Sequence, residues 1–104
     1  MASLQKMIET VLNKGDALPD KLAQKMGLDI GLEAASTGNA LSLQVLLRDE
    51  SDTAKWVGLF AASEVSSSIV DIKQDILELK NHQNLEVSRM ANICEEIAVG
   101  AGFW

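Results

Sequence analysis

The segment GLFAASEVSSSIVDIKQDILEL, residues 58–79, carries the strongest structural signal in this chain. Apolar residues recur in it at alternating intervals of four and three, at Val65, Ile69, Ile72, Ile76 and Leu79. We call these residues the heptad seam. Such spacing places an apolar stripe along one side of a helix and requires a second helix to cover it.

The stripe extends beyond the seam in both directions. Backward it reaches Ala62 and Gly58, and forward it becomes polar and then apolar again, at Gln83, Glu86, Met90, Ile93 and Ile97. Val70 and Leu77 flank the seam and widen it to nearly half of the helix. A stripe that wide suits a bundle better than a two-stranded coiled coil. The sequence therefore predicts an all-α fold, a small helical bundle with a long heptad-patterned helix in its second half.

Two short helices are predicted in the N-terminal region, residues 1–27. The first, over residues 3–14, has apolar residues at helical spacing, begins at the capping residue Ser3 and stops at Gly15. Pro19 suits the first turn of a second helix, which we expect to stop at Gly27.

A third helix is predicted within residues 28–50, from a cap at Asp29 to Arg48. Ala34, Gly38 and Ser42 give it a face nearly bare of side chains, against which another helix could approach closely. The alternating apolar residues of 41–47 also fit a strand. The surrounding helical periodicity makes the helix our preferred interpretation.

The polar segment 48–52 separates this helix from the next, which we expect to begin at Ser51 or Asp52 and to continue through the seam to Lys80. Residues 81–84, Asn-His-Gln-Asn, leave two alternatives open. They form a turn into a fifth helix over 85–98, or the helix continues through them. Residues 52–99 are thus one long helix or a helical hairpin, followed by an apolar tail over 100–104, all within a single domain over 1–104.

Composition excludes several classes of function. The chain has 104 residues and a formal net charge of −6, which disfavours nucleic acid and anionic membranes as partners. The longest uncharged stretch, 34–47, is shorter than the roughly 18 residues that span a bilayer. With one cysteine and no cleavable signal peptide, we expect a cytoplasmic protein, while export without a cleaved signal stays open.

No catalytic, cofactor-binding or metal-binding residues can be assigned. Glu78, His82 and Glu86 would share a face on a continuous helix, but metal sites need more ligands, and we interpret them as a solvated polar face or a turn. Cys94 lies between apolar residues and is predicted to be a core thiol. No glycine-rich phosphate loop is present. We therefore expect no cofactor and no enzymatic activity.

Trp56-Val57-Gly58 resembles the Trp-x-Gly motif of a family of small, acidic, secreted helical proteins. In that family the motif lies between two antiparallel helices, which the resemblance would imply here. The match covers three residues, and the tail lacks the Tyr-x-x-x-Asp/Glu signal that the family often carries. Our interpretation of Trp56 is a core or interface aromatic.

Our hypothesis for function is a non-enzymatic interaction protein that self-associates. The apolar residues of 56–79 and the aromatic tail are the expected interface, comprising Trp56, Leu59, Phe60, Val65, Ile69, Ile72, Ile76, Leu79, Phe103 and Trp104. One alternative is a small acidic adaptor, inhibitor or chaperone that binds another protein. A second alternative is a secreted or membrane-active helical protein.

Overall fold

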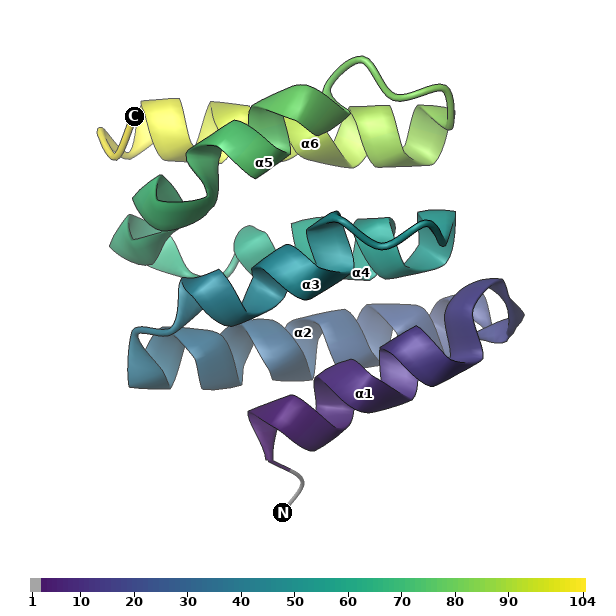
Figure 1. Cartoon of the computed structure of the whole chain (residues 1–104). Coiled ribbons are helices and arrows are strands. Elements are labelled where there is room, and N and C mark those ends of the chain that lie inside the picture. The colour runs from purple at the N-terminus through teal and green to yellow at the C-terminus, as the bar shows by residue number, and fades with distance from the viewer. Residues whose placement is uncertain (1–2) are drawn as a thin grey trace.

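A computed structural model describes residues 3–104 as three stacked pairs of antiparallel helices (Figure 1). The pairs are α1 (Leu4–Lys14) with α2 (Asp20–Thr37), α3 (Gln44–Leu47) with α4 (Asp52–Ala62), and α5 (Lys73–Leu79) with α6 (Leu85–Gly100). Short 3₁₀ helices η1 (Gly15–Ala17), η2 (Ala40–Leu43) and η3 (Ser66–Ile72) join or extend them. No strand is present among these residues, which confirms the all-α class and the helical bundle.

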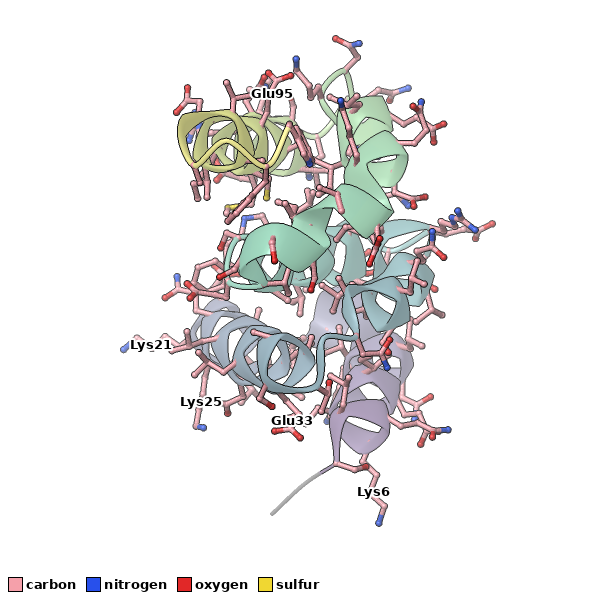
Figure 2. The ribbon with its side chains drawn as sticks, turned by 90° about the vertical axis from the view of Figure 1, so that its left-hand side faces the viewer. Lys6, Lys21, Lys25, Glu33 and Glu95 are labelled. Atoms are coloured by element: carbon pink, nitrogen blue, oxygen red, sulfur yellow. The ribbon has the colours of Figure 1, made fainter. Side chains whose placement is uncertain are left out.

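The central helix of the stack is α4, which packs on α2 on one side and on α6 on the other. Helices α2, α4 and α6 run in the same direction, and α1, α3 and α5 run in the opposite one (Figure 1). Seen along the helices, α2 and α6 lie on one side of the stack, and Lys21, Lys25 and Glu33 project outward from α2 (Figure 2). The N-terminal ends of α2, α4 and α6 therefore lie at the same end of the molecule.

The first helix has the predicted bounds because its signals are local. The Ser3 side chain accepts a hydrogen bond from the Lys6 N–H, and Gly15, with a φ of 51°, ends the helix. That backbone conformation strains residues with a side chain, which is why glycine is favoured there.

The predicted stop at Gly27 and the predicted helix within 28–50 are wrong. Helix α2 continues through Gly27 and ends at Gly38, whose φ is 65°. Gly27 and Gly31 lie where α2 crosses α4. A Cβ added at Gly27 would lie 2.7 Å from Cδ2 of Phe60, and one at Gly31 would lie 2.7 Å from the carbonyl oxygen of Ala61. These glycines allow close helix packing and do not end the helix.

Residues 40–47 are helical, as preferred over the strand, but they form η2 and the short α3. Leu43, Leu46 and Leu47 enter the core, whereas Leu41 and Val45 are exposed. Between α3 and α4, Ser51 caps the start of α4: its side chain accepts a hydrogen bond from the Ala54 N–H. This cap was predicted from the polar segment 48–52.

The predicted continuous helix from 52 to 80 is divided. Helix α4 ends at Ala62, the chain turns at 63–65, and the seam continues through η3 into α5. Ser66 follows the turn with a φ of 56°. The break lets the chain leave α4 and return as the first helix of the third pair, so the long helix becomes two layers of the stack (Figure 1).

Of the two alternatives for residues 81–84, the turn is correct. Asn84 caps α6, since its side-chain oxygen accepts hydrogen bonds from the N–H groups of Glu86 and Val87. His82 stabilises the same turn by accepting a hydrogen bond at Nδ1 from the Asn84 N–H, at 3.0 Å. Helices α5 and α6 thus form the hairpin, and α6 extends to Gly100.

The apolar tail folds back onto its own chain. The N–H groups of Phe103 and Trp104 both donate to the carbonyl oxygen of Ala98, at 2.8 and 3.3 Å. Both aromatic side chains are partly buried against the core, and Lys73 Nζ lies 5.7 Å from the centre of the Trp104 ring. The aromatic end of the tail is thus partly buried against its own chain.

One carboxylate is buried among the described residues, Asp75 in α5. It accepts hydrogen bonds from Gln44 Nε2 at 2.9 Å and from Arg48 Nε at 2.7 Å, which link α5 to α3. The hydrogen bond and the negative charge of Asp75 raise the pKa of Arg48 above its ordinary value. Within residues 3–104, the helices are too short or too polar to cross a membrane.

Candidate functional site

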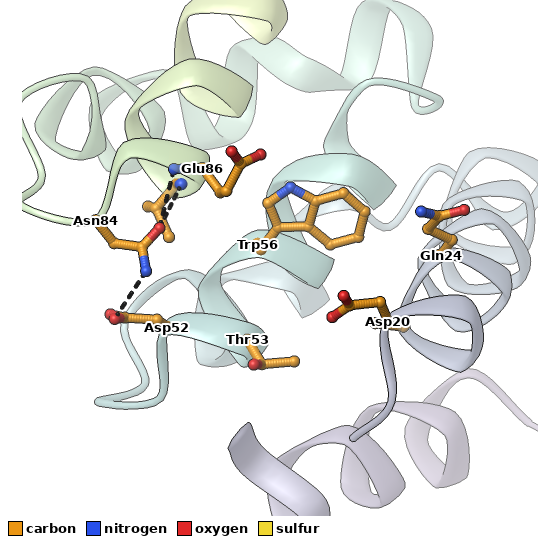
Figure 3. Close-up of a pocket in the computed structure, with 9 residues that line it drawn as sticks. Asp20, Gln24, Asp52, Thr53, Trp56, Asn84 and Glu86 are labelled. Atoms are coloured by element: carbon orange, nitrogen blue, oxygen red, sulfur yellow. Dashed lines mark hydrogen bonds between the residues drawn. The ribbon is translucent and has the colours of Figure 1, made fainter. Parts of the chain in front are cut away.

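The N-terminal ends of α2, α4 and α6 surround a surface cavity of about 320 Å³, which we call the Trp56 pocket (Figure 3). All three helices contribute to its wall, together with the residue that caps α6. The lining residues are Asp20, Ala23, Gln24, Asp52, Thr53, Trp56, Asn84, Glu86 and Val87.

The indole of Trp56 packs against the ring of Phe60. Its ring centre lies 5.2 Å from that of Phe60, one turn later in α4, and the two planes are tilted by 33°. Phe60 in turn packs against Gly27 of α2, where the missing side chain leaves room for its ring. A partly exposed aromatic with such support is preorganised for contact with a ligand, because little side-chain entropy remains to be lost.

Three carboxylates at the Trp56 pocket have a structural role as well. Asp20 and Asp52 are the first residues of α2 and α4, and Glu86 is in the first turn of α6. An acidic residue there offsets the positive end of the helix dipole, equivalent to roughly half a charge per helix. Three dipoles therefore compensate only about half of the three negative charges. The charged side chains that line the pocket are thus all acidic, and the helix dipoles offset their charge only in part.

The three carboxylates differ in their hydrogen-bond and ion-pair partners. Asp52 accepts a hydrogen bond from Asn84 Nδ2 at 3.2 Å (Figure 3). The other carboxylate oxygen of Asp52 lies 3.6 Å from His82 Nε2. Glu86 pairs with Arg89 at 3.2 Å on the exposed surface. Asp20 has no ion-pair partner within residues 3–104. Asp20 and Glu86 are therefore the acids most accessible to a ligand, since exposed pairs such as Glu86–Arg89 are weak.

The expected interface residues are distributed over two environments. Most of them, including the whole heptad seam, lie in the interior with at most 7% of their surface exposed: Leu59, Val65, Ile69, Ile72, Ile76 and Leu79. Trp56, Phe60, Phe103 and Trp104 are partly buried at its edge. Only Trp56 of these ten lines the Trp56 pocket. The seam is covered by the chain's own helices and is not a free surface in this fold.

Glu78, His82 and Glu86 are not brought onto one face, because the turn at 81–84 separates α5 from α6. No group of three or more potential ligands in residues 3–104 has the geometry of a metal site. Trp56-Val57-Gly58 lies inside α4, whereas the Trp-x-Gly family has its motif between helices.

Cys94 is a core thiol, as predicted. Its side chain is fully buried, and its thiol donates a hydrogen bond to the carbonyl oxygen of Leu59, at 3.1 Å. Burial raises the pKa of the thiol from 9.0 to about 12, because the thiolate would be poorly solvated there.

We predict that iodoacetamide alkylates Cys94 at pH 8 at least about a thousandfold more slowly in the folded protein than in denaturant, because the thiolate is so much rarer. The same shift stabilises the fold below pH 9.0, and this contribution disappears as pH rises towards about 12. Mass spectrometry after timed alkylation measures the first effect, and urea titrations at pH 8 and pH 11 measure the second. Rapid labelling of the native protein at pH 8 would contradict a buried thiol.

Sequence reasoning missed most residues of the Trp56 pocket. From the sequence, Asp52 is indicated only as a possible helix start, and Glu86 only as a polar position beyond the seam and as a member of the set Glu78, His82 and Glu86. Asp20 is not singled out by any sequence pattern. Their proximity depends on every second helix running in the same direction, which is a property of the stack. The available signal was an acidic residue in the first turn of each of three helices.

No protein-family model, no curated protein and no solved structure matches this chain.

Proposed function

We propose that this protein is a non-enzymatic domain that binds a protein partner through one face of α2, α4 and α6. The single observation that supports the proposal is the position of Trp56: its ring packs against Phe60 and also lines a surface cavity. Aromatic residues in such positions contribute most to binding at protein interfaces. An acidic adaptor was one of the alternatives that the sequence left open, and this geometry favours it.

Apolar residues continue from the Trp56 pocket along the same three helices. Leu28 follows Gln24 by one turn in α2, and Ile93 and Ile97 follow Glu86 by two and three turns in α6; all three are exposed. Phe60 occupies the corresponding position in α4. Since the helices run in the same direction, these residues all follow the pocket towards the C-terminal ends of the helices, and we propose that they continue its surface as an apolar strip. We define the binding face as Asp20, Gln24, Leu28, Trp56, Phe60, Glu86, Ile93 and Ile97.

The charge of the molecule complements the apolar strip. A net charge of −6 and three carboxylates at one end of the face favour a partner that is basic there and apolar beyond. Charge complementarity of this kind accelerates association and weakens with added salt. We propose a cytoplasmic site of action, because a single thiol needs no oxidising compartment.

We predict that Trp56→Ala weakens partner binding by at least about tenfold, the loss expected when a central aromatic is truncated. The partner is isolated from the native host on immobilised protein at low salt, purified, and titrated by isothermal calorimetry. Leu41→Ala is the matched control, because Leu41 is an exposed leucine outside the binding face. Circular dichroism checks that each variant is folded, and Asp20→Asn tests the face without removing any packing. Equal affinities for all the variants would refute the proposed face.

Self-association is a second candidate function, favoured by the exposed side chains of Leu85, Ile93, Ile97 and Val99 on α6. It would use this exposed surface, because the heptad seam is buried and the aromatic residues of the tail are partly buried against their own chain. Sedimentation velocity at micromolar concentrations distinguishes the two candidates: a dimer that dissociates on dilution favours self-association, and a monomer favours a different partner.

A further inference from the structure

We infer that the Trp56 pocket receives one arginine side chain of the partner, with its guanidinium stacked on the indole of Trp56 and its N–H groups donating to Asp20 and Glu86. This inference rests on the proposed function, because the arginine belongs to the bound protein. It specifies the chemistry that the acidic end of the binding face recognises.

The size of the pocket fits one side chain. At about 320 Å³ it lies at the lower limit of small-molecule sites, which span roughly 300–1,000 Å³. Its wall combines an aromatic ring and the apolar side chains of Ala23 and Val87 with polar groups at the rim. The aliphatic part of a long basic side chain would contact the aromatic ring and the apolar side chains, and its charged end would contact the polar groups.

The negative charge of the pocket's side chains favours a cationic ligand over an anionic one. Helix N-termini alone would attract an anion. Here each of the three carries a carboxylate, and about half of that negative charge is left uncompensated by the dipoles. The face of the indole adds attraction for a positive group. An anionic ligand would meet three carboxylates at once.

The arrangement of acceptors decides for arginine over lysine. Asp20 and Gln24 lie on one side of the Trp56 ring and Glu86 on another (Figure 3). A guanidinium is planar, stacks on aromatic rings and has five N–H donors that point in several directions, so it can reach both sides while it covers the ring. An ammonium is a compact, strongly hydrated point charge that engages one side at a time.

The test uses small probes on the full chain, followed by two-dimensional ¹H–¹⁵N NMR. N-acetyl-arginine amide is titrated beside its lysine and citrulline counterparts; citrulline has nearly the shape of arginine and no charge. Arginine is expected to shift the Trp56 indole N–H and the backbone amides of Asp20 and Glu86, with about tenfold weaker binding for lysine and none for citrulline. Asp20→Asn combined with Glu86→Gln should abolish these shifts, whereas Glu33→Gln, which removes an acid elsewhere on α2, should not.

Each outcome bears on a separate claim. Equal shifts with arginine and citrulline, or shifts that persist in the double variant, would overturn the arginine assignment. If arginine causes no shift while Trp56→Ala still weakens binding of the purified partner, the proposed function stands and the assignment fails. If the partner binds Trp56→Ala as tightly as it binds the unsubstituted chain, the proposed function itself fails.

Discussion

Replacing Ile72 with alanine is expected to lower the free energy of unfolding by about 2–5 kcal/mol, the usual loss for a fully buried isoleucine. Ile72 is 0% exposed and belongs to the heptad seam that the chain covers with its own helices. An 11.2 kDa domain has a total stability of only about 5–15 kcal/mol, so the loss is a large part of it. Urea denaturation followed by circular dichroism measures the change.

Val70→Ala is the matched control, since Val70 is two residues away in the same 3₁₀ helix and 49% exposed. It should change stability by less than about 0.5 kcal/mol. Sedimentation of both variants distinguishes an interior seam from an interface between copies. Loss of an oligomer in Ile72→Ala, with the fold intact and no change in the urea midpoint, would show that the seam joins two molecules.

Gly31→Ala is the second substitution with a large expected effect. The added Cβ would lie 2.7 Å from the carbonyl oxygen and 3.0 Å from the Cα of Ala61, both backbone atoms that cannot move without separating α2 from α4. Overpacking of this kind costs about 1–3 kcal/mol. Because the atoms in the way belong to the backbone, we expect an overpacking cost in the upper part of that range. The higher helix propensity of alanine offsets roughly 1 kcal/mol of this cost. Thermal and urea denaturation measure the loss.

Gly100→Ala is its control, because Gly100 ends α6 and a Cβ added there would meet open space. The same substitution there should leave the protein as stable or up to about 1 kcal/mol more stable. A Gly31→Ala variant as stable as Gly100→Ala would mean that α2 and α4 do not approach as closely as described.

The sequence predicted well those features that short-range chemistry determines. Ser3, Gly15 and Ser51 bound their helices as expected, because a cap requires only neighbouring backbone groups. The prediction that Gly27 ends a helix is wrong, because the sequence does not distinguish a glycine that ends a helix from one that makes room for a side chain of another helix, here Phe60.

The division of the predicted long helix had no clear sequence signal. No proline or glycine lies in residues 63–72, and the seam keeps its period through the 3₁₀ segment. An average spacing of about 3.5 residues lies between the roughly 3.0 of a 3₁₀ helix and the roughly 3.6 of an α-helix, so the pattern continues across a change of helix type. The seam therefore predicted which residues are buried without predicting what covers them.

The candidate site was predictable only in its aromatic part. Trp56 and Phe60 were expected contact residues from their place beside the seam, and the structure keeps both at the edge of the core. Asp20 and Glu86 share the pocket with Trp56 only because three hairpins stack with alternate helices in the same direction. Such proximity depends on the packing of the whole chain.

The placement of the two tryptophans has an optical consequence. The chain contains no tyrosine, so its ultraviolet emission comes almost entirely from Trp56 in the pocket and Trp104 in the tail. Each ring lies in a different pair of the stack, on α4 and after α6. Trp104→Phe would leave a fluorophore that reports on the pocket, and Trp56→Phe one that reports on whether the tail stays docked. The protein thus contains its own pair of spectroscopic probes, one for each end of its second half.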